Sequence, residues 1–123
     1  MKLAVVDLID VTSNNRNREL LVIKAICDAM KIEFMEFPVN VLPVNDWFDS
    51  NTVCIVRGSV KTRKMWLNKL TEMEQRGCIM VNTRDCIELC NDKFRTYLAL
   101  ERAGLNQPKT VLVPSEYDNL IDY

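Results

Sequence analysis

The sequence predicts an α/β domain, a three-layer sandwich with a mainly parallel sheet of four to five strands. Two observations lead to this fold class. Short apolar runs rich in β-branched residues alternate along the chain with segments whose apolar residues recur at helical spacing, which is the pattern of parallel strands joined by helical crossovers. The length of 123 residues, 48% of them hydrophobic, favours one such domain over two.

The first predicted elements are a strand, a loop and a helix. Leu3 to Ile9 is a mainly apolar, β-branched run, typical of a strand covered on both faces, so we expect it at the centre of the sheet. The polar cluster from Thr12 to Asn15 carries helix-capping side chains. The following helix is indicated by apolar residues at near-helical spacing: Leu20, Leu21, Ile23, Ala25, Ile26 and Met30.

The next two strands differ in their expected exposure. Ile32 to Phe37 alternates apolar and acidic residues and is ended by Pro38, which favours a more exposed strand toward the edge of the sheet. Val39 to Ser50 shows no clear period. Thr52 to Val56 is again a buried type of strand, and a loop follows it.

The last elements complete the alternation. Helical spacing predicts a helix from Lys61 to Arg76, and Gly77 stands where a C-cap glycine is expected. Cys78 to Val81 predicts a fourth strand, and a helix that continues or restarts should then run to Gly104. Lys109 to Val113 predicts a final strand. The order of elements is that of a Rossmann-like domain.

The composition excludes several classes of function. Acidic and basic residues are mixed along the chain, and the net charge of -1 leaves no electrostatic footprint for nucleic acid or an anionic membrane. Small molecules or proteins are the expected partners. The N-terminus lacks the charge order and length of a signal peptide or a membrane span, and five cysteines without a CxxC spacing indicate free thiols. We expect a soluble cytoplasmic protein.

Catalytic and metal sites of the common kinds are not expected. The absence of histidine excludes Ser-His-Asp and Cys-His catalysis, and neither GxGxxG nor GxxxxGK[ST] is present to hold phosphates on backbone amides. Cys86 and Cys90 would share a helical face, but two thiols make an incomplete metal site, so core packing is favoured. Asp7 and Asp10 flank the end of the first strand and suit acid-base work or Mg²⁺; loop capping by Asp10 is favoured.

The carboxyl edge of the predicted sheet carries the candidate binding residues. Ligands of open parallel sheets bind outside the carboxyl ends of the strands, and Arg57, Gly58 and Ser59 follow the third strand there. An arginine fork beside a glycine and a hydroxyl suits a carboxylate or a phosphate. Taken alone, these residues fit a turn with a solvated arginine better. Asn82 follows the fourth strand at the same edge.

Residues 81–110 carry a family resemblance. Asn82 ends a strand, the pair Asp92-Lys93 opens a second helix, and Gly104-Leu105-Asn106-Gln107-Pro108-Lys109-Thr110 leads to a further strand. In order and spacing this stretch resembles ATP-grasp enzymes of the glutathione synthetase, RimK-like ligase and D-alanine–D-alanine ligase kind. The preceding part resembles these enzymes only in architecture, as the Rossmann-like domain that they place before the ATP-grasp core.

The resemblance implies a role for each part of the chain. Residues 1–113 would be the pre-ATP-grasp domain and residues 114–123 the start of the connection to a core that is absent here. Lys93 would reach nucleotide phosphates, while Arg57, Gly58, Ser59 and Asn82 would contact a small-molecule carboxylate or amino acid. ATP and Mg²⁺ would be cofactors of the full-length ligase, with the remaining ATP-grasp core as partner. The chain alone is not expected to be catalytic.

A second interpretation stays open at this point. The domain would then be a non-catalytic protein-binding or regulatory module that uses Trp47, Phe48 and Met65 as its contact residues. Such a module would be derived from the same ancestral domain. A homodimer is compatible with both interpretations.

Overall fold

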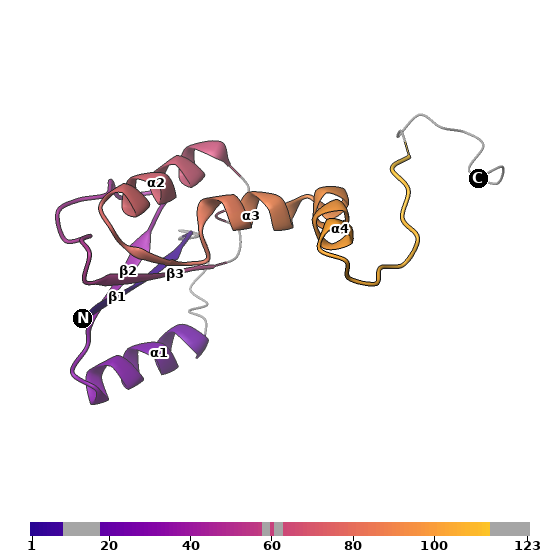
Figure 1. Ribbon diagram of the computed structural model, residues 1–123. Coiled ribbons are helices and arrows are strands. Elements are labelled where there is room, and N and C mark those ends of the chain that lie inside the picture. Colours follow the sequence, from indigo (N-terminus) through magenta and orange to yellow (C-terminus); the bar gives the residue numbers. More distant parts are fainter. Residues whose placement is uncertain (9–17, 58–59, 61–62, 114–123) are drawn as a thin grey trace. The chain divides into compact units, whose positions relative to one another are not determined.

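The computed structural model describes residues 1–8, 18–57, 60 and 63–113 (Figure 1). The chain divides into two compact units, Met1–Ile87 and Glu88–Tyr123. Gly58, Ser59, the capping cluster from Thr12 to Asn15, Asp10 and residues 114–123 lie outside the described residues. The described elements are β1 (Lys2–Asp7), α1 (Arg18–Ala29), β2 (Glu33–Pro38), β3 (Thr52–Val56), α2 (Lys64–Gln75), β4 (Ile79–Val81), α3 (Arg84–Asn91) and α4 (Lys93–Arg102).

The four described strands form one parallel sheet in the order β2-β1-β3-β4. The predicted fold class is confirmed, since α1 and α2 lie on opposite sides of this sheet in a three-layer arrangement (Figure 1). The predicted positions of two strands are also confirmed: β1 pairs with strands on both sides, and β2 is at an edge.

The predicted strand at Lys109 to Val113 is wrong. These residues have no strand conformation, and the ladders among the described residues join only β1 to β4. A strand exists through its hydrogen bonds to a neighbour, so β-branched composition without a paired neighbour leaves a segment irregular.

One face of the sheet forms the main core. Alternate residues of the strands point to this face, and they pack with buried residues of α2 and of the connecting loops. The cluster is made of Ala4, Val6, Phe37, Val39, Phe48, Cys54, Val60, Leu67, Leu70, Met73 and Cys78. The core therefore combines one helix with loop residues that are distant in sequence.

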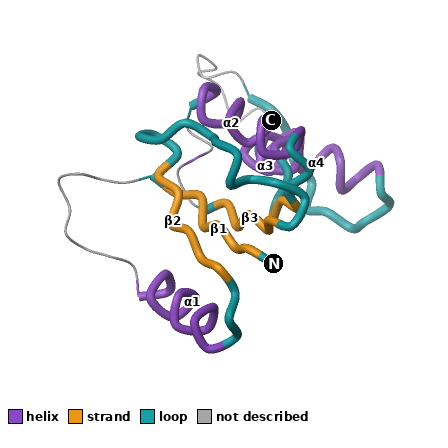
Figure 2. Tube along the Cα trace, turned by 90° about the vertical axis from the view of Figure 1, so that its left-hand side faces the viewer, coloured by secondary structure: helices purple, strands orange, loops and turns teal. Residues whose placement is uncertain are grey.

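The other face is covered by α1 alone among the described elements of the first unit. Val5 of β1 is buried with Leu20 and Cys27 of α1, all three outside the main cluster. Farther along the sheet, Ile79 and Val81 of β4 are 59% and 46% exposed. Figure 2 shows α1 set on its side of the sheet, away from α2. This second core is much smaller than the first.

The ends of α2 and α4 follow the same C-cap pattern. Gly77 has φ +88°, and the amides of Gly77 and Cys78 donate to the carbonyls of Glu74 and Met73 at 3.0 and 3.1 Å. This is the Schellman motif, in which a left-handed residue satisfies the last carbonyls of a helix. The expected C-cap glycine is therefore confirmed, and Gly104 ends α4 likewise with φ +79°.

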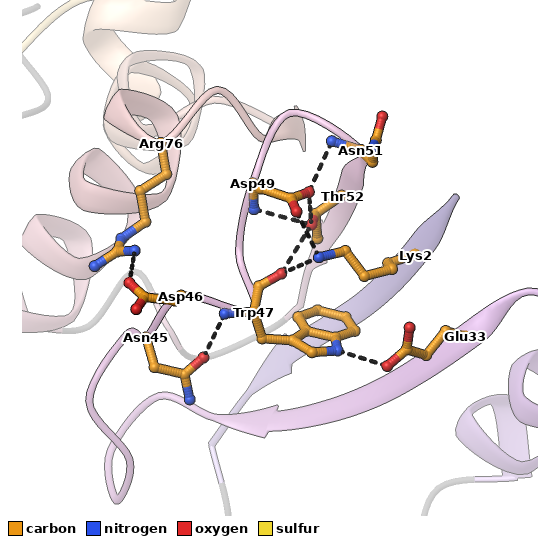
Figure 3. A network of polar contacts seen from close by, with 9 residues as sticks. All are labelled: Lys2, Glu33, Asn45, Asp46, Trp47, Asp49, Asn51, Thr52 and Arg76. Carbon is orange, nitrogen blue, oxygen red and sulfur yellow. Dashed lines mark hydrogen bonds and ion pairs between the residues drawn. The ribbon is translucent and has the colours of Figure 1, made fainter.

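A polar network at the amino ends of the strands closes the loop from Val39 to Ser50 (Figure 3). Lys2 Nζ donates to the Trp47 carbonyl and, at 2.9 Å, to Asp49 Oδ2. The Trp47 indole N–H donates to Glu33 Oε1 at 2.9 Å. The starts of β1 and β2 thus hold the loop that carries Phe48 into the core.

Candidate functional site

The carboxyl edge of the sheet is organised around the end of β1. The Arg57 amide donates to the Val6 carbonyl, and the Val39 amide donates to the Asp7 carbonyl, both at 2.9 Å. These bonds extend the ladders one residue beyond β3 and β2, so the backbone of Arg57 is fixed beside the end of β1. Arg57 lies where ligands of open parallel sheets bind.

The Arg57 guanidinium is mostly buried and only partly paired. Its side chain is 19% exposed, and Nη2 lies 2.8 Å from Glu19 Oε2 in the first turn of α1. Nη1 is buried and has no hydrogen-bond partner among the residues that the structure describes. A solvated turn arginine would not show this burial. An unsatisfied buried donor costs about 1–3 kcal/mol, so an anion that paired with Nη1 would recover that cost.

Val60 anchors the chain just after Arg57. Its side chain is buried in the main cluster, and the side chain of Val56 packs against the same cluster. Gly58 and Ser59, the two other expected substrate contacts of this loop, lie outside the described residues.

Asn82 reaches the same edge from the neighbouring strand. It follows β4 directly, and β4 pairs with β3 so that Ile55 is level with Val81. The structure thus places Asn82 and Arg57 at the ends of adjacent strands, although no hydrogen bond joins their side chains among those described. Asn82 is exposed, and Thr83 Oγ1 accepts the Cys86 amide at 3.3 Å where α3 begins.

The Asp7 side chain accepts a hydrogen bond from the backbone at the end of β1. Its Oδ1 accepts the amide of Leu8 at 2.8 Å. Within the part of the chain that the structure describes, no group of three or more His, Cys, Asp or Glu side chains is arranged to hold a metal ion. The favoured capping role of Asp10 concerns a residue that is not described, and it stays a prediction.

Lys93 belongs to the second unit, where it is the first residue of α4. The helix begins at Asp92, whose side chain accepts the Arg95 amide at 2.9 Å. This cap explains why the helix restarts at this point, one of the two predicted outcomes. The Lys93 side chain is exposed and has no hydrogen bond or ion pair among the residues described. Its ammonium group is available to an anion.

The aromatic residues of the second interpretation do not form an open surface. Phe48 is 1% exposed and packs edge-to-face on Phe37, with ring centroids 5.0 Å apart. Trp47 is half-buried and held by the network around Lys2. Met65 alone of the three is largely exposed. No observation therefore favours a protein-binding module built on these residues.

The cysteines divide into two groups. All five are free, as expected; Cys27, Cys54 and Cys78 are buried, and burial raises the pKa of the Cys54 thiol to about 12. Cys86 and Cys90 are exposed, so the expectation that they pack in a core is wrong. The reason is that α3 buries none of its residues in this structure, although its pattern is amphipathic.

Glu19 contacts Arg57 in the candidate site, and sequence reasoning did not predict this contact. The only local signal is an acidic side chain in the first turn of a helix, which is ordinarily explained by the helix dipole. Its contact with Arg57 joins residues 38 positions apart, and no periodicity in the sequence records such a contact.

Comparison with known proteins finds a similarity to a ligase. No protein-family model matches the chain. The Glutamate–LysW ligase ArgX of Sulfolobus acidocaldarius is 30% identical to it in an alignment of 104 residues that covers 81% of this chain and 35% of the relative. The chain is therefore similar to part of a ligase. This finding supports the ATP-grasp-related origin expected from residues 81–110, and the chain spans about a third of that ligase's length, 35%.

None of the described helices is long and apolar enough to cross a membrane.

Proposed function

We propose that this chain is the N-terminal, substrate-side domain of an ATP-dependent carboxylate–amine or amino acid ligase, and that it is not catalytic alone. The observation that carries the proposal is the similarity to a ligase over 81% of the chain. The parallel sheet and the partly paired arginine at its carboxyl edge support it. We propose a cytoplasmic protein that works together with an ATP-grasp core.

In this proposal the carboxyl edge binds the substrate. The Arg57 fork would hold a carboxylate through two parallel N–H bonds, a geometry that a lysine cannot reproduce. Gly58 and Ser59 would contact the same substrate from the loop, and Asn82 from the end of β4. The substrate class is a small-molecule carboxylate or an amino acid.

The described residues fit ATP only in part. The exposed ammonium of Lys93 suits a phosphate contact, whereas the described residues offer no carboxylate cluster for Mg²⁺. We therefore propose that ATP and Mg²⁺ bind to the ATP-grasp core. The nucleotide would activate a carboxylate there, and Lys93 would contribute one contact to its phosphates.

The substrate-side role is tested by calorimetry on the 123-residue chain with a panel of amino acids and dicarboxylates. We expect weak binding of at least one carboxylate and a loss of about tenfold or more in Arg57→Ala, because a charge-assisted double hydrogen bond is removed. Arg102→Ala, which removes an exposed arginine from α4, is the matched control and should bind normally. Binding that is absent, or that survives Arg57→Ala unchanged, would overturn this role.

Lys93 is tested in a ligase that joins this domain to an ATP-grasp core. Lys93→Ala should weaken ATP binding, whereas Lys109→Ala, an exposed lysine of the same unit, should not. Equal ATP affinity and turnover in wild type and Lys93→Ala would remove Lys93 from the nucleotide site.

A further inference from the structure

Glu19 occupies the position that an anionic ligand of Arg57 would need. Its Oε2 lies 2.8 Å from Nη2, so one of the two outer guanidinium nitrogens is already paired with a carboxylate. The other, Nη1, is buried without a partner among the described residues. An anion with two oxygens could pair with both nitrogens, whereas the Glu19 carboxylate pairs with one and leaves the other unsatisfied.

We infer that Glu19 is an internal counter-anion of the binding site, which holds Arg57 in place and gives way when a ligand carboxylate or phosphate takes both Nη positions. The inference rests on the proposed function, because it assumes that Arg57 binds substrate. It adds a residue that sets the affinity and selectivity of the same site.

The exposure of the two partners favours this exchange. The Arg57 side chain is 19% exposed, whereas that of Glu19 is 74% exposed. Arg57 is thus the more enclosed partner of the pair, and most of the Glu19 side chain is in contact with solvent. An incoming anion would replace the Glu19 carboxylate on Arg57, so the mostly buried guanidinium would keep a counter-charge throughout the exchange.

The position of Glu19 in its helix also favours the exchange. It stands in the first turn of α1, where the unpaired amides of the helix favour a negative charge. After leaving Arg57, the carboxylate would still lie in a favourable field. The helix itself is held to the sheet by Leu20 and Cys27, so it does not depend on the ion pair.

The inference predicts that a substitution at the binding site strengthens anion binding. Removing the charge of Glu19 should raise the affinity of the chain for anions, because the ligand no longer competes with a carboxylate and no longer meets its repulsion. If Glu19 only supported the shape of the site, its removal would leave the affinity unchanged or lower it. The sign of the change therefore separates the two roles.

The test compares Glu19→Gln with wild type by calorimetry, using glutarate and inorganic phosphate as probes in separate arms. The substitution keeps the size of the side chain and an oxygen that accepts from Nη2. We expect binding to tighten about threefold to fivefold in the arm whose chemistry matches the site, the size expected for one exposed ion pair. The glutarate arm reports a carboxylate site and the phosphate arm a phosphoryl site.

Asp28→Asn is the matched control. Asp28 is an exposed acid of the same helix, so its substitution changes the net charge of the chain and of α1 by the same amount. Arg57→Lys should weaken binding in both the wild-type and the Glu19→Gln background. Thermal unfolding of each variant checks that the fold is kept.

The outcomes separate the inference from the proposed function. Tighter anion binding by Glu19→Gln than by wild type, without tighter binding by Asp28→Asn, supports the inference. Measurable binding by Glu19→Gln alone supports it as well. Equal affinity in all three proteins, with binding lost in Arg57→Lys, overturns the counter-anion role and leaves the proposed function standing. Equal tightening in Glu19→Gln and Asp28→Asn overturns it too, since net charge then explains the change. No binding by any protein overturns both.

Discussion

The two faces of the sheet are covered to very different extents. On the α2 face, buried residues of the helix and the loop residues Val39, Phe48 and Val60 pack together in one cluster with the strands. On the α1 face, the described residues of the first unit supply one helix only. A helix about 10 Å across covers roughly two strands spaced about 4.8 Å apart, so β3 and β4 stay partly open.

This difference shows where the first unit gains its stability. Burial of apolar area is the main favourable contribution to folding, and it is concentrated on the α2 face. The α1 face instead keeps apolar side chains in contact with solvent: Leu21, Val22, Ile26, Met30, Ile79 and Val81. The four predictions below test this contrast.

The largest effect is expected for Leu70→Ala. Leu70 is fully buried at the centre of the α2 face, and truncation of such a leucine costs about 2–5 kcal/mol in the free energy of unfolding. Ile26→Ala on the exposed side of α1 is the paired variant and should cost less than about 1 kcal/mol. Urea unfolding followed by circular dichroism measures both. Similar losses in the two variants would remove the contrast between the faces.

A second prediction uses the buried thiols as reporters of the two faces. Cys27 lies under α1, whereas Cys54 and Cys78 belong to the main cluster. Segments with fewer buried contacts open at lower free energy, so Cys27 should be labelled about tenfold or more faster than Cys54. Mass spectrometry after alkylation of the native protein measures the rates. Exposed Cys86 and Cys90 should react first, and faster labelling of Cys54 than of Cys27 would contradict the comparison.

A third prediction concerns the network that fixes Phe48 in the α2 face. The hydrogen bond from Lys2 lowers the pKa of the Asp49 carboxyl from its ordinary value of 3.8. A carboxyl whose pKa is depressed in the folded state adds stability above its unfolded pKa, and this stability is lost as the pH falls through the folded value. Lys2→Ala should lower the urea midpoint at pH 7.

The same pair predicts a pH dependence. When the pH falls from above about 3.8 to below it, the free energy of unfolding should decrease more for wild type than for Lys2→Ala. The reason is that the variant has no Lys2–Asp49 bond to lose. Lys31→Ala, an exposed lysine beyond α1, is the control for net charge. Parallel pH profiles for wild type and Lys2→Ala would argue against the network.

The smallest effect is expected at β4. Ile79→Thr keeps β-branching at a position that is more than half exposed, so the free energy of unfolding should change by less than about 0.5 kcal/mol. Thermal unfolding measures this change. A loss of several kcal/mol would indicate that the α1 face is covered over β4 in solution.

The strands were predictable because their signal is local. The apolar runs of β1 and β3 mark central strands, and the alternation with acids in β2 marks an edge. The conformation of the segment from Val39 to Ser50 was not predictable from periodicity. It is fixed by the packing of Phe48 in the core and by the hydrogen bond from Lys2 to Trp47. The prediction of a strand at Lys109 to Val113 was wrong although the composition suits a strand, because no neighbouring strand among the described residues pairs with this segment.

The candidate site was predictable only in position. The rule for parallel sheets located Arg57 and Asn82 at one edge, because both follow strands whose direction is fixed by the crossovers. The burial of the guanidinium and its contact with Glu19 depend on how α1 returns to the sheet. Such a tertiary contact leaves no trace in the spacing of residues.

The two edge strands of the sheet, β2 and β4, differ in the features that limit pairing with a strand of another chain. An open edge strand can template pairing with another chain, and proteins limit this with charges, proline or short strands. β2 carries Glu33 and Glu36 and ends at Pro38, whereas β4 has only three residues, Ile79–Val81. Acidic side chains and a proline thus limit pairing at β2, and the short length of the strand limits it at β4.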